Sequence, residues 1–201
     1  RKIVTDISEI TAQTGFKRFN FTDDECPPEV VDRLSETIIQ HSLNIHWSVS
    51  IRFERGLTPE RCRTWAEAGL KTVFMGLESF NDRILKRMKK GISVDSIVKG
   101  LASLREAGIR AHVFMIAGFP TETEEEAIAG YERLARHVEN GEISGFIYSP
   151  FQILPGSPLA ADIHRHGVQS IDTAMYARRD IPHPVFYFDA EGMPRRRVFE
   201  L

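Results

Sequence analysis

Five apolar segments of strand length recur along this chain of 201 residues, and helical segments separate each one from the next. Parallel strands need a long crossover connection, usually a helix, whereas antiparallel hairpins are joined by short turns. The alternation therefore predicts a parallel sheet with right-handed crossovers. The strands are expected at residues 17–22, 45–52, 72–78, 112–118 and 143–151, and a first helix is expected before them.

One of these strands has a polar face. In residues 45–52 the apolar side chains alternate strictly with His46, Ser48, Ser50 and Arg52. Strands that are buried on both faces usually appear as continuous apolar runs, so a polar face indicates a lined cavity. The chain also contains neither the glycine-rich loop nor the phosphate loop of flat nucleotide-binding sheets. The predicted fold class is α/β, a partial (βα) TIM-like barrel of parallel strands.

Composition argues against several classes of partner. The net charge of -2 and the pI of about 6.4 give no large positive field for nucleic acid or an anionic membrane, and the longest run of consecutive basic residues is Arg195–Arg197. No window approaches the ~20 apolar residues of a membrane-spanning helix. Cys26 and Cys62, without an extracellular signal, are typical of reduced thiols, so a cytoplasmic location is expected.

Carboxylates follow two of the expected strands, at the edge where barrels of this class bind ligands. Glu78 ends one strand and could accept two hydrogen bonds from a ribose diol, or it could be a solvated loop acid. Asp23, Asp24 and Glu25 follow the first strand and could bind an ammonium group or a metal. They could equally stabilise the start of the next helix through its dipole. The residue pattern leaves both interpretations open.

Basic residues near the same edge also have two interpretations. Arg52 closes the polar strand, where its guanidinium could hold a carboxylate or a ribose oxygen. A salt bridge to Glu78 or Asp24 is the alternative. Lys90 ends the helix after Glu78 and could simply satisfy the last carbonyl groups of that helix. No metal site is predicted from the spacing of the histidines, cysteines and acids.

Several motifs together resemble the radical S-adenosylmethionine (SAM) superfamily, especially the branch whose members often carry a cobalamin-binding domain ahead of the barrel. The motifs, in order, are Glu9-Ile10, FNFTDDE (19–25), IHWSVSIRFE (45–54), GLESFNDRILKRMKKG (76–91), GFPTETEEE (118–126) and LPGSPL (154–159). Each motif is weak by itself, but their order and spacing together are specific. The resemblance implies a partial βα barrel with six core strands, the first of which would precede this chain.

The resemblance also implies roles for individual residues in binding SAM. Asp23 and Asp24 match the motif that holds the amino group of SAM. Glu78 matches the group that binds its ribose, and Lys90 matches a basic position that can meet its carboxylate.

Three further residues are matched to the cofactor groove. Ser50 and Arg52 match an edge where polar groups reach the cofactor or the substrate. Gly118 matches the strand that contacts adenine, where the absence of a side chain would let the backbone approach the base. No catalytic residue is assigned.

One departure from the family is large. Its C-x-x-x-C-x-x-C loop is absent, and Cys26 and Cys62 cannot replace three clustered thiolates for a [4Fe-4S] cluster. This chain is therefore expected to be cut from a longer protein and not to cleave SAM by itself. The intact enzyme, with its cluster, would generate a 5′-deoxyadenosyl radical that abstracts hydrogen from an unknown substrate. Cobalamin is expected, if at all, in a further N-terminal domain, and no cofactor is expected to bind this chain tightly.

The expected organisation is a partial barrel over residues 1–160, holding strands two to six, and an extension over residues 161–201. The aromatic residues and histidine of the extension either close one end of the barrel and shape substrate choice or only pack; they are Tyr176, His183, Phe186, Tyr187 and Phe188. The expected partner is a small-molecule or peptide substrate. Without a preceding strand, residues 17–22 would leave an open edge that invites self-association.

Two other functions fit the same residues. A barrel hydrolase or lyase could use Glu78 and Asp24 as acid and base, and it would require a metal or a carboxyl group of raised pKa in the lumen. A non-catalytic scaffold module is the third possibility.

Overall fold

The computed structural model describes residues 2–53, 56–154, 156–172 and 187–200, apart from the side chains of residues 24, 172 and 187. The helices of the barrel region are α1 (Lys2–Thr14), α2 (Pro28–Gln40), α3 (Pro59–Glu67), α4 (Asp82–Arg87), α5 (Val94–Glu106) and α6 (Glu124–Glu139). Its strands are β1 (Arg18–Cys26), β2 (His46–Ile51), β3 (Leu70–Glu78), β4 (Arg110–Ala117) and β5 (Gly145–Pro150). None of the helices described here combines the length and the apolar character needed to cross a membrane.

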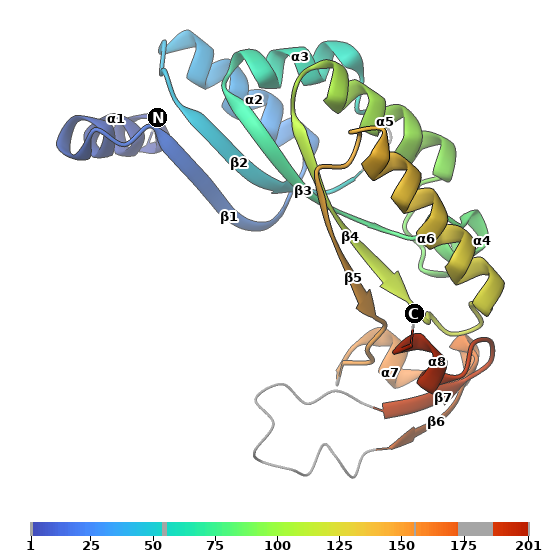
Figure 1. Cartoon of the computed structure of the whole chain (residues 1–201). Coiled ribbons are helices and arrows are strands. Elements are labelled where there is room, and N and C mark those ends of the chain that lie inside the picture. The colour runs from blue at the N-terminus through green and yellow to red at the C-terminus, as the bar shows by residue number, and fades with distance from the viewer. Residues whose placement is uncertain (1, 54–55, 155, 173–186, 201) are drawn as a thin grey trace.

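The five strands form one sheet in the order β1-β2-β3-β4-β5, and every neighbouring pair is parallel. Figure 1 shows α2, α3, α5 and α6 on the convex side of this curved sheet. Within the described chain, the concave inner face therefore stays open along most of its length. The predicted α/β partial barrel of parallel strands is confirmed.

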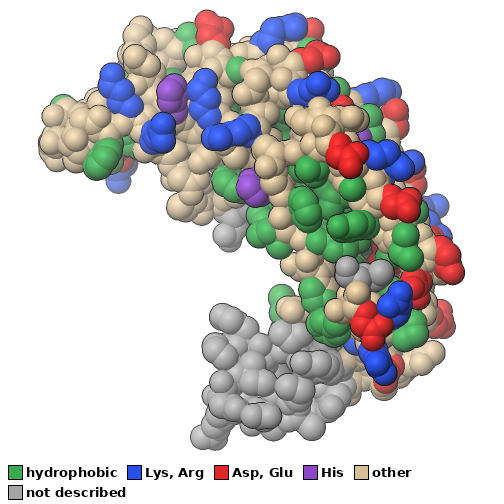
Figure 2. All heavy atoms as spheres, viewed as in Figure 1, with side chains coloured by type: hydrophobic (Ala, Val, Ile, Leu, Met, Phe, Trp, Pro, Cys, Tyr) green, Lys and Arg blue, Asp and Glu red, His purple; other side chains and the backbone are tan. Residues whose placement is uncertain are grey.

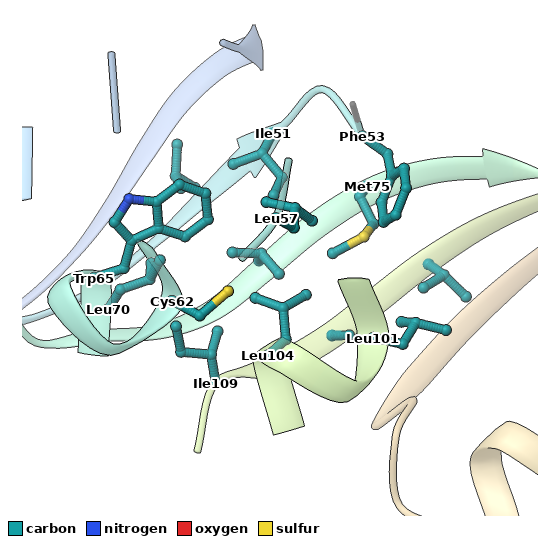
Figure 3. Packing of buried hydrophobic residues seen from close by; sticks show 14 of the residues in the cluster. Ile51, Phe53, Leu57, Cys62, Trp65, Leu70, Met75, Leu101, Leu104 and Ile109 are labelled. Carbon is teal, nitrogen blue, oxygen red and sulfur yellow. The ribbon is translucent and has the colours of Figure 1, made fainter. Parts of the chain in front are cut away.

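The alternation along β2 explains how the two faces differ. Trp47, Val49 and Ile51 are buried against the helices, whereas Ser48 and Ser50 are half-buried on the inner face. The core beneath the helices is close-packed and includes side chains from α3, α5, β2 and β3 (Figure 3). Buried indoles keep their hydrogen bonds, since Trp47 Nε1 donates to the carbonyl oxygen of Ala68 at 2.8 Å. The sheet is thus apolar towards the helices and polar towards the lumen.

Helix starts follow the expected capping chemistry. The Thr123 hydroxyl accepts from the Glu126 N–H, and the Glu126 carboxylate accepts from the Thr123 N–H, which forms the predicted capping box of α6. The helix expected over residues 82–90 instead ends at Arg87, because Lys89 adopts a left-handed conformation with φ 57°. That turn directs the chain back towards the end of β3.

The acidic run after the first strand differs from expectation. Asp23 and Asp24 are predicted to follow the strand, but their backbones lie inside β1, which continues to Cys26. The pairing register of β1 with β2 shifts between Phe21 and Cys26. Because of this irregularity in the pairing, the acidic residues lie within the strand, at a position where the sequence predicts a loop.

The chain after β5 forms a small layer at the carboxyl ends of β4 and β5 (Figure 1). It contains α7 (Pro158–Ala161), the 3-10 helix η1 (His164–His166), the antiparallel pair β6 (Val168–Asp172) and β7 (Tyr187–Ala190), and α8 (Arg195–Val198). Phe188 is buried and packs edge-on against Phe151, with ring centroids 5.8 Å apart. Tyr176, His183 and Phe186, and the side chain of Tyr187, lie outside the described residues.

Candidate functional site

A pocket of about 430 Å³ lies at the carboxyl end of the sheet. β3 and β4 contribute Glu78 and Ile116, and the chain after β5 supplies the facing wall. Small-molecule sites in proteins commonly have volumes of roughly 300 to 1,000 Å³. The lining residues are Glu78, Arg87, Met88, Lys89, Lys90, Ile116, Phe119, Phe151, Gln152, Ile153, Leu154, Ser157, Pro158, Leu159 and His166.

An ion pair between Glu78 and Lys90 is the central polar feature of this pocket. Lys90 Nζ lies 2.8 Å from Glu78 Oε1, and the two side chains keep 29% and 16% of their surface exposed, respectively. Gly76 makes this possible, because a Cβ on Gly76 would collide with the Glu78 carboxylate. The sequence-predicted residues Glu78 and Lys90 are therefore brought together in the same pocket.

The backbone around this ion pair is unusual. Glu78 has a φ of 67°, in the left-handed region that favours glycine, and the register between β3 and β4 shifts between Gly76 and Glu78. Such a conformation costs roughly 1 to 3 kcal/mol in a residue with a side chain, and strain of this kind clusters at binding sites. The shift re-aims the end of β3, so that the Glu78 carboxylate lies beside Lys90.

The rest of the pocket combines positive charge with an aromatic wall. Arg87, Lys89 and His166 line it together with the ion pair, and Glu78 is the single acid among the lining residues that the structure describes. Phe119 and Phe151 form an edge-on pair with ring centroids 4.9 Å apart. The pocket can therefore hold a ligand that carries an anionic group at one end and an apolar ring at the other.

The other predicted residues of β1 and β2 lie outside the pocket lining. Ser50 is half-buried on the inner face and pairs in register with Phe74 of β3. Arg52 follows β2, and its backbone N–H donates to the Cys26 carbonyl at 3.1 Å. Asp23 is exposed at the edge of β1, and the side chain of Asp24 lies outside the described residues. These residues occupy the same carboxyl edge as Glu78, and their roles stay predictions.

Gly118 ends β4 in a left-handed conformation with φ 73°. Its N–H donates to Glu122 Oε2 at 2.6 Å, and a Cβ on it would lie 2.5 Å from Val198 Cγ2. In this structure Gly118 therefore allows the close approach of α8, and its contact with adenine stays a prediction. Glu122 is 2% exposed, and burial raises the pKa of its carboxyl to about 7.

Sequence reasoning missed Glu122 because it treats this acidic run as the start of a helix. The backbone of Glu122 is held by the chain after residue 187, since the Met193 N–H donates to its carbonyl oxygen, and no local pattern indicates this contact. Glu122 does not line the pocket around Glu78. A hydrolase or lyase would need a carboxyl group of raised pKa in the pocket. Glu122 has such a pKa, but it lies outside the pocket lining.

The thiols of the described chain do not fit an iron–sulfur cluster. Cys26 and Cys62 are both free and buried, and burial raises the pKa of Cys62 to about 12. Burial and the charge of Asp23 also raise the pKa of Cys26. Cluster ligands are thiolates, and no group of three or more His, Cys, Asp or Glu within the described residues could hold a metal ion. No step through a cluster is derived from these residues.

The fold and the pocket define a parallel partial barrel with a pocket of small-molecule size at the carboxyl edge of its strands. The sequence profile of the radical SAM superfamily matches residues 2–134. The chain belongs to this superfamily, as its motifs predict. All of the predicted site residues fall inside the matched region.

Curated relatives include a methyltransferase and a methylthiotransferase. The chain is 30% identical to uncharacterized methyltransferase PH0819 of Pyrococcus horikoshii, over 64% of this chain and 28% of the relative. It is also 30% identical to the threonylcarbamoyladenosine tRNA methylthiotransferase MtaB of Treponema pallidum, over 62% of this chain and 26% of the relative. The chain thus spans about a quarter of the length of these relatives.

Solved structures support the fold. TsrM from Kitasatospora setae, a radical SAM methyltransferase solved with cobalamin and a [4Fe-4S] cluster, matches with a TM-score of 0.65 at 18% identity, over 84% of this chain and 33% of that chain. The cobalamin-dependent SAM radical enzyme OxsB matches with a TM-score of 0.68 at 15% identity, over 95% of this chain and 34% of that chain. At these identities the likeness concerns the fold alone.

Proposed function

We propose that this chain forms the SAM-binding part of a radical SAM enzyme. The observation that carries the proposal is the Glu78–Lys90 ion pair, which lies in a pocket at the carboxyl edge of a radical SAM barrel. The proposed ligand has a ribose diol, a carboxylate and an aromatic base. The pocket offers a matching carboxylate, ammonium group and apolar wall.

Each group has a distinct part in holding the ligand. The Glu78 carboxylate accepts hydrogen bonds from the two ribose hydroxyls, because an ionised carboxylate has several acceptor positions and Lys90 occupies only one of them. The Lys90 ammonium faces the carboxylate of SAM. Ile116 and Phe119 cover the adenine and exclude water from it. Asp23 and Asp24 at the same edge are proposed to hold the amino group, with Ser50 and Arg52 beside them.

The reaction belongs to the intact protein. A [4Fe-4S] cluster bound elsewhere supplies the electron for radical formation, and the residues described here only bind and orient SAM. The methyltransferase and methylthiotransferase relatives favour transfer of a methyl or methylthio group. The substrate proposed for this chain is a small molecule or a peptide, in contrast to the tRNA that the name of MtaB gives. Cobalamin, if the protein uses it, is proposed to bind a separate domain. A cytoplasmic location is part of the same proposal.

Calorimetric titration of the full 201-residue chain with SAM tests the binding step. Wild-type protein is expected to bind, and Glu78→Gln is expected to bind at least about tenfold more weakly, because the amide loses a charge and an acceptor. The matched control is Glu36→Gln, which neutralises an exposed acid on α2. If Glu78→Gln binds SAM as wild type does, or wild type does not bind it, the proposal is wrong.

A further inference from the structure

A row of basic residues crosses the opposite, amino-terminal edge of the sheet. Arg18, His46 and Arg110 are the first residues of β1, β2 and β4, and Lys71 is the second residue of β3. All four line one pocket of about 420 Å³. These four positions are far apart in the sequence, so they form no basic run there, in contrast to residues 195–197.

The strand register places these side chains together. Arg18 pairs with His46, and Arg110 pairs with Thr72, the residue beside Lys71. Arg18, His46 and Arg110 therefore point to the inner face, on the side opposite the buried core residues. Between β2 and β3 the register shifts so that β3 carries one extra residue, and that residue is Lys71. The irregularity adds the Lys71 ammonium group to the row.

The row lacks counter-ions within the described part of the chain. Its four basic residues are exposed, none of them forms an ion pair there, and the pocket lining contains no acid. Figure 2 shows blue and purple side chains gathered over the starts of β1 to β3, with no red among them. The half-buried Ser48 and Thr72 add hydroxyl groups to the lining. Like charges held this close repel each other, and an anion between them removes that repulsion.

We infer that this amino-terminal pocket binds a small molecule that carries two or more phosphate groups. Neighbouring strands lie about 4.8 Å apart, so the row from β1 to β4 spans roughly 14 Å. One phosphate can contact two neighbouring cations, and a chain of phosphates can contact more. The pocket is concave and of small-molecule size, which fits a short chain of phosphates.

This site is separate from the proposed SAM site. Thr72 and Glu78 mark the two pockets on β3, and at about 3.3 Å per residue they lie roughly 20 Å apart. Both pockets can therefore be filled at the same time. If the chain does not bind SAM, the proposed phosphate site is unaffected. If the chain does not bind phosphate, the proposed SAM site is unaffected.

Titration calorimetry with inorganic triphosphate, and with orthophosphate as a weaker probe, tests the inference on the full chain. Wild-type protein is expected to bind triphosphate more tightly than orthophosphate. The double variant Lys71→Ala/Arg110→Ala is expected to weaken triphosphate binding at least about tenfold. Both side chains are exposed, and if the double variant does not fold, Lys71→Ala alone gives the same comparison with a smaller loss.

The matched control removes the same net charge elsewhere. Arg63 and Lys99 are exposed cations paired with Glu60 and Asp95, so Arg63→Ala/Lys99→Ala should leave binding unchanged. Equal losses in the two double variants would show a general charge effect and overturn the site. Absence of triphosphate binding by wild type, or binding of a single-stranded RNA oligonucleotide alone, would also overturn it.

Discussion

The buried Glu122 carboxyl makes the stability of this fold depend on pH. Its Oε2 accepts the Gly118 N–H at 2.6 Å, and its own carbonyl oxygen accepts the Met193 N–H at 2.7 Å. The preceding Thr121 N–H donates to the Glu191 carbonyl at 2.6 Å. Glu122 therefore lies where the C-terminal layer is attached to the barrel. Burial raises the pKa of Glu122 to about 7, from an ordinary value of 4.5.

The direction of the effect follows from that raised pKa. The folded state favours the protonated carboxyl, so its contribution to stability is fully present below pH 4.5 and is lost as the pH rises through about 7. With these two pKa values, the free energy of unfolding should fall by about 2.5 kcal/mol between about pH 5 and about pH 8. Glu126 acts in a different window, because Arg83 lowers its pKa to about 2.

Denaturant unfolding at several pH values measures this contribution. Glu122→Gln keeps an acceptor for the Gly118 N–H but cannot ionise, so its stability should lack the loss of about 2.5 kcal/mol. The control Glu139→Gln, an exposed acid on α6, should follow wild type. If wild type and Glu122→Gln lose stability in parallel over this range, the assignment of the slope to Glu122 is refuted.

Three further predictions concern backbone positions and the sheet edge. Gly118→Ala should lower the free energy of unfolding by roughly 2 to 4 kcal/mol, because the methyl group meets Val198 and φ is 73°. Gly76→Ala should displace the Glu78 carboxylate and abolish SAM binding in calorimetry, with the fold retained. The outer edge of β1 has no strand partner in the described chain, so sedimentation should show concentration-dependent self-association.

Matched glycines separate local strain from the proposed contacts. Gly141→Ala has a similar φ of 69° and open space around its Cβ position, so it should cost only about 1 to 2 kcal/mol. Gly130→Ala, on α6 and also without neighbours, should leave SAM binding unchanged. Equal stability losses at Gly118 and Gly141, or unchanged SAM affinity in Gly76→Ala, would contradict these predictions. A protein that stays monomeric at every concentration would contradict the edge prediction.

Local chemistry explains which parts of the fold could be predicted from the sequence. The alternation of apolar and polar side chains in residues 45–52 directly predicts that the strand has two different faces. In the structure one face is buried and the other lines the lumen. The capping box of Thr123 and Glu126 spans four residues, so its geometry is contained in the sequence. Parallel pairing follows from the helices between strands.

Features that depend on distant segments could not be predicted in this way. The hydrogen bond from the Met193 N–H to the Glu122 carbonyl joins distant segments, and the basic row requires that Arg18 and Arg110 begin strands of the same sheet. The extra residue of β3 at Lys71 has no local signal either, because a register shift is a property of the pair of strands. Glu78 could be proposed from its place at the end of a strand, and Lys90 through the family resemblance, but their ion pair could not be predicted, because it depends on the left-handed turn at Lys89.

The C-terminal layer connects the stability of the fold with the proposed site. Phe151 and His166 line the pocket proposed to bind SAM, and Phe151 packs on the buried Phe188 of β7. β7 is followed by Glu191, whose carbonyl holds the Thr121 N–H beside Glu122. If the hydrogen bonds at Thr121 and Glu122 were lost, the pocket wall that faces Glu78 and Lys90 would therefore become less well fixed. Glu78 itself would keep its place at the end of β3. Because the chain after β5 supplies one wall of the pocket, opposite the ends of β3 and β4, the layer is a structural part of the proposed site.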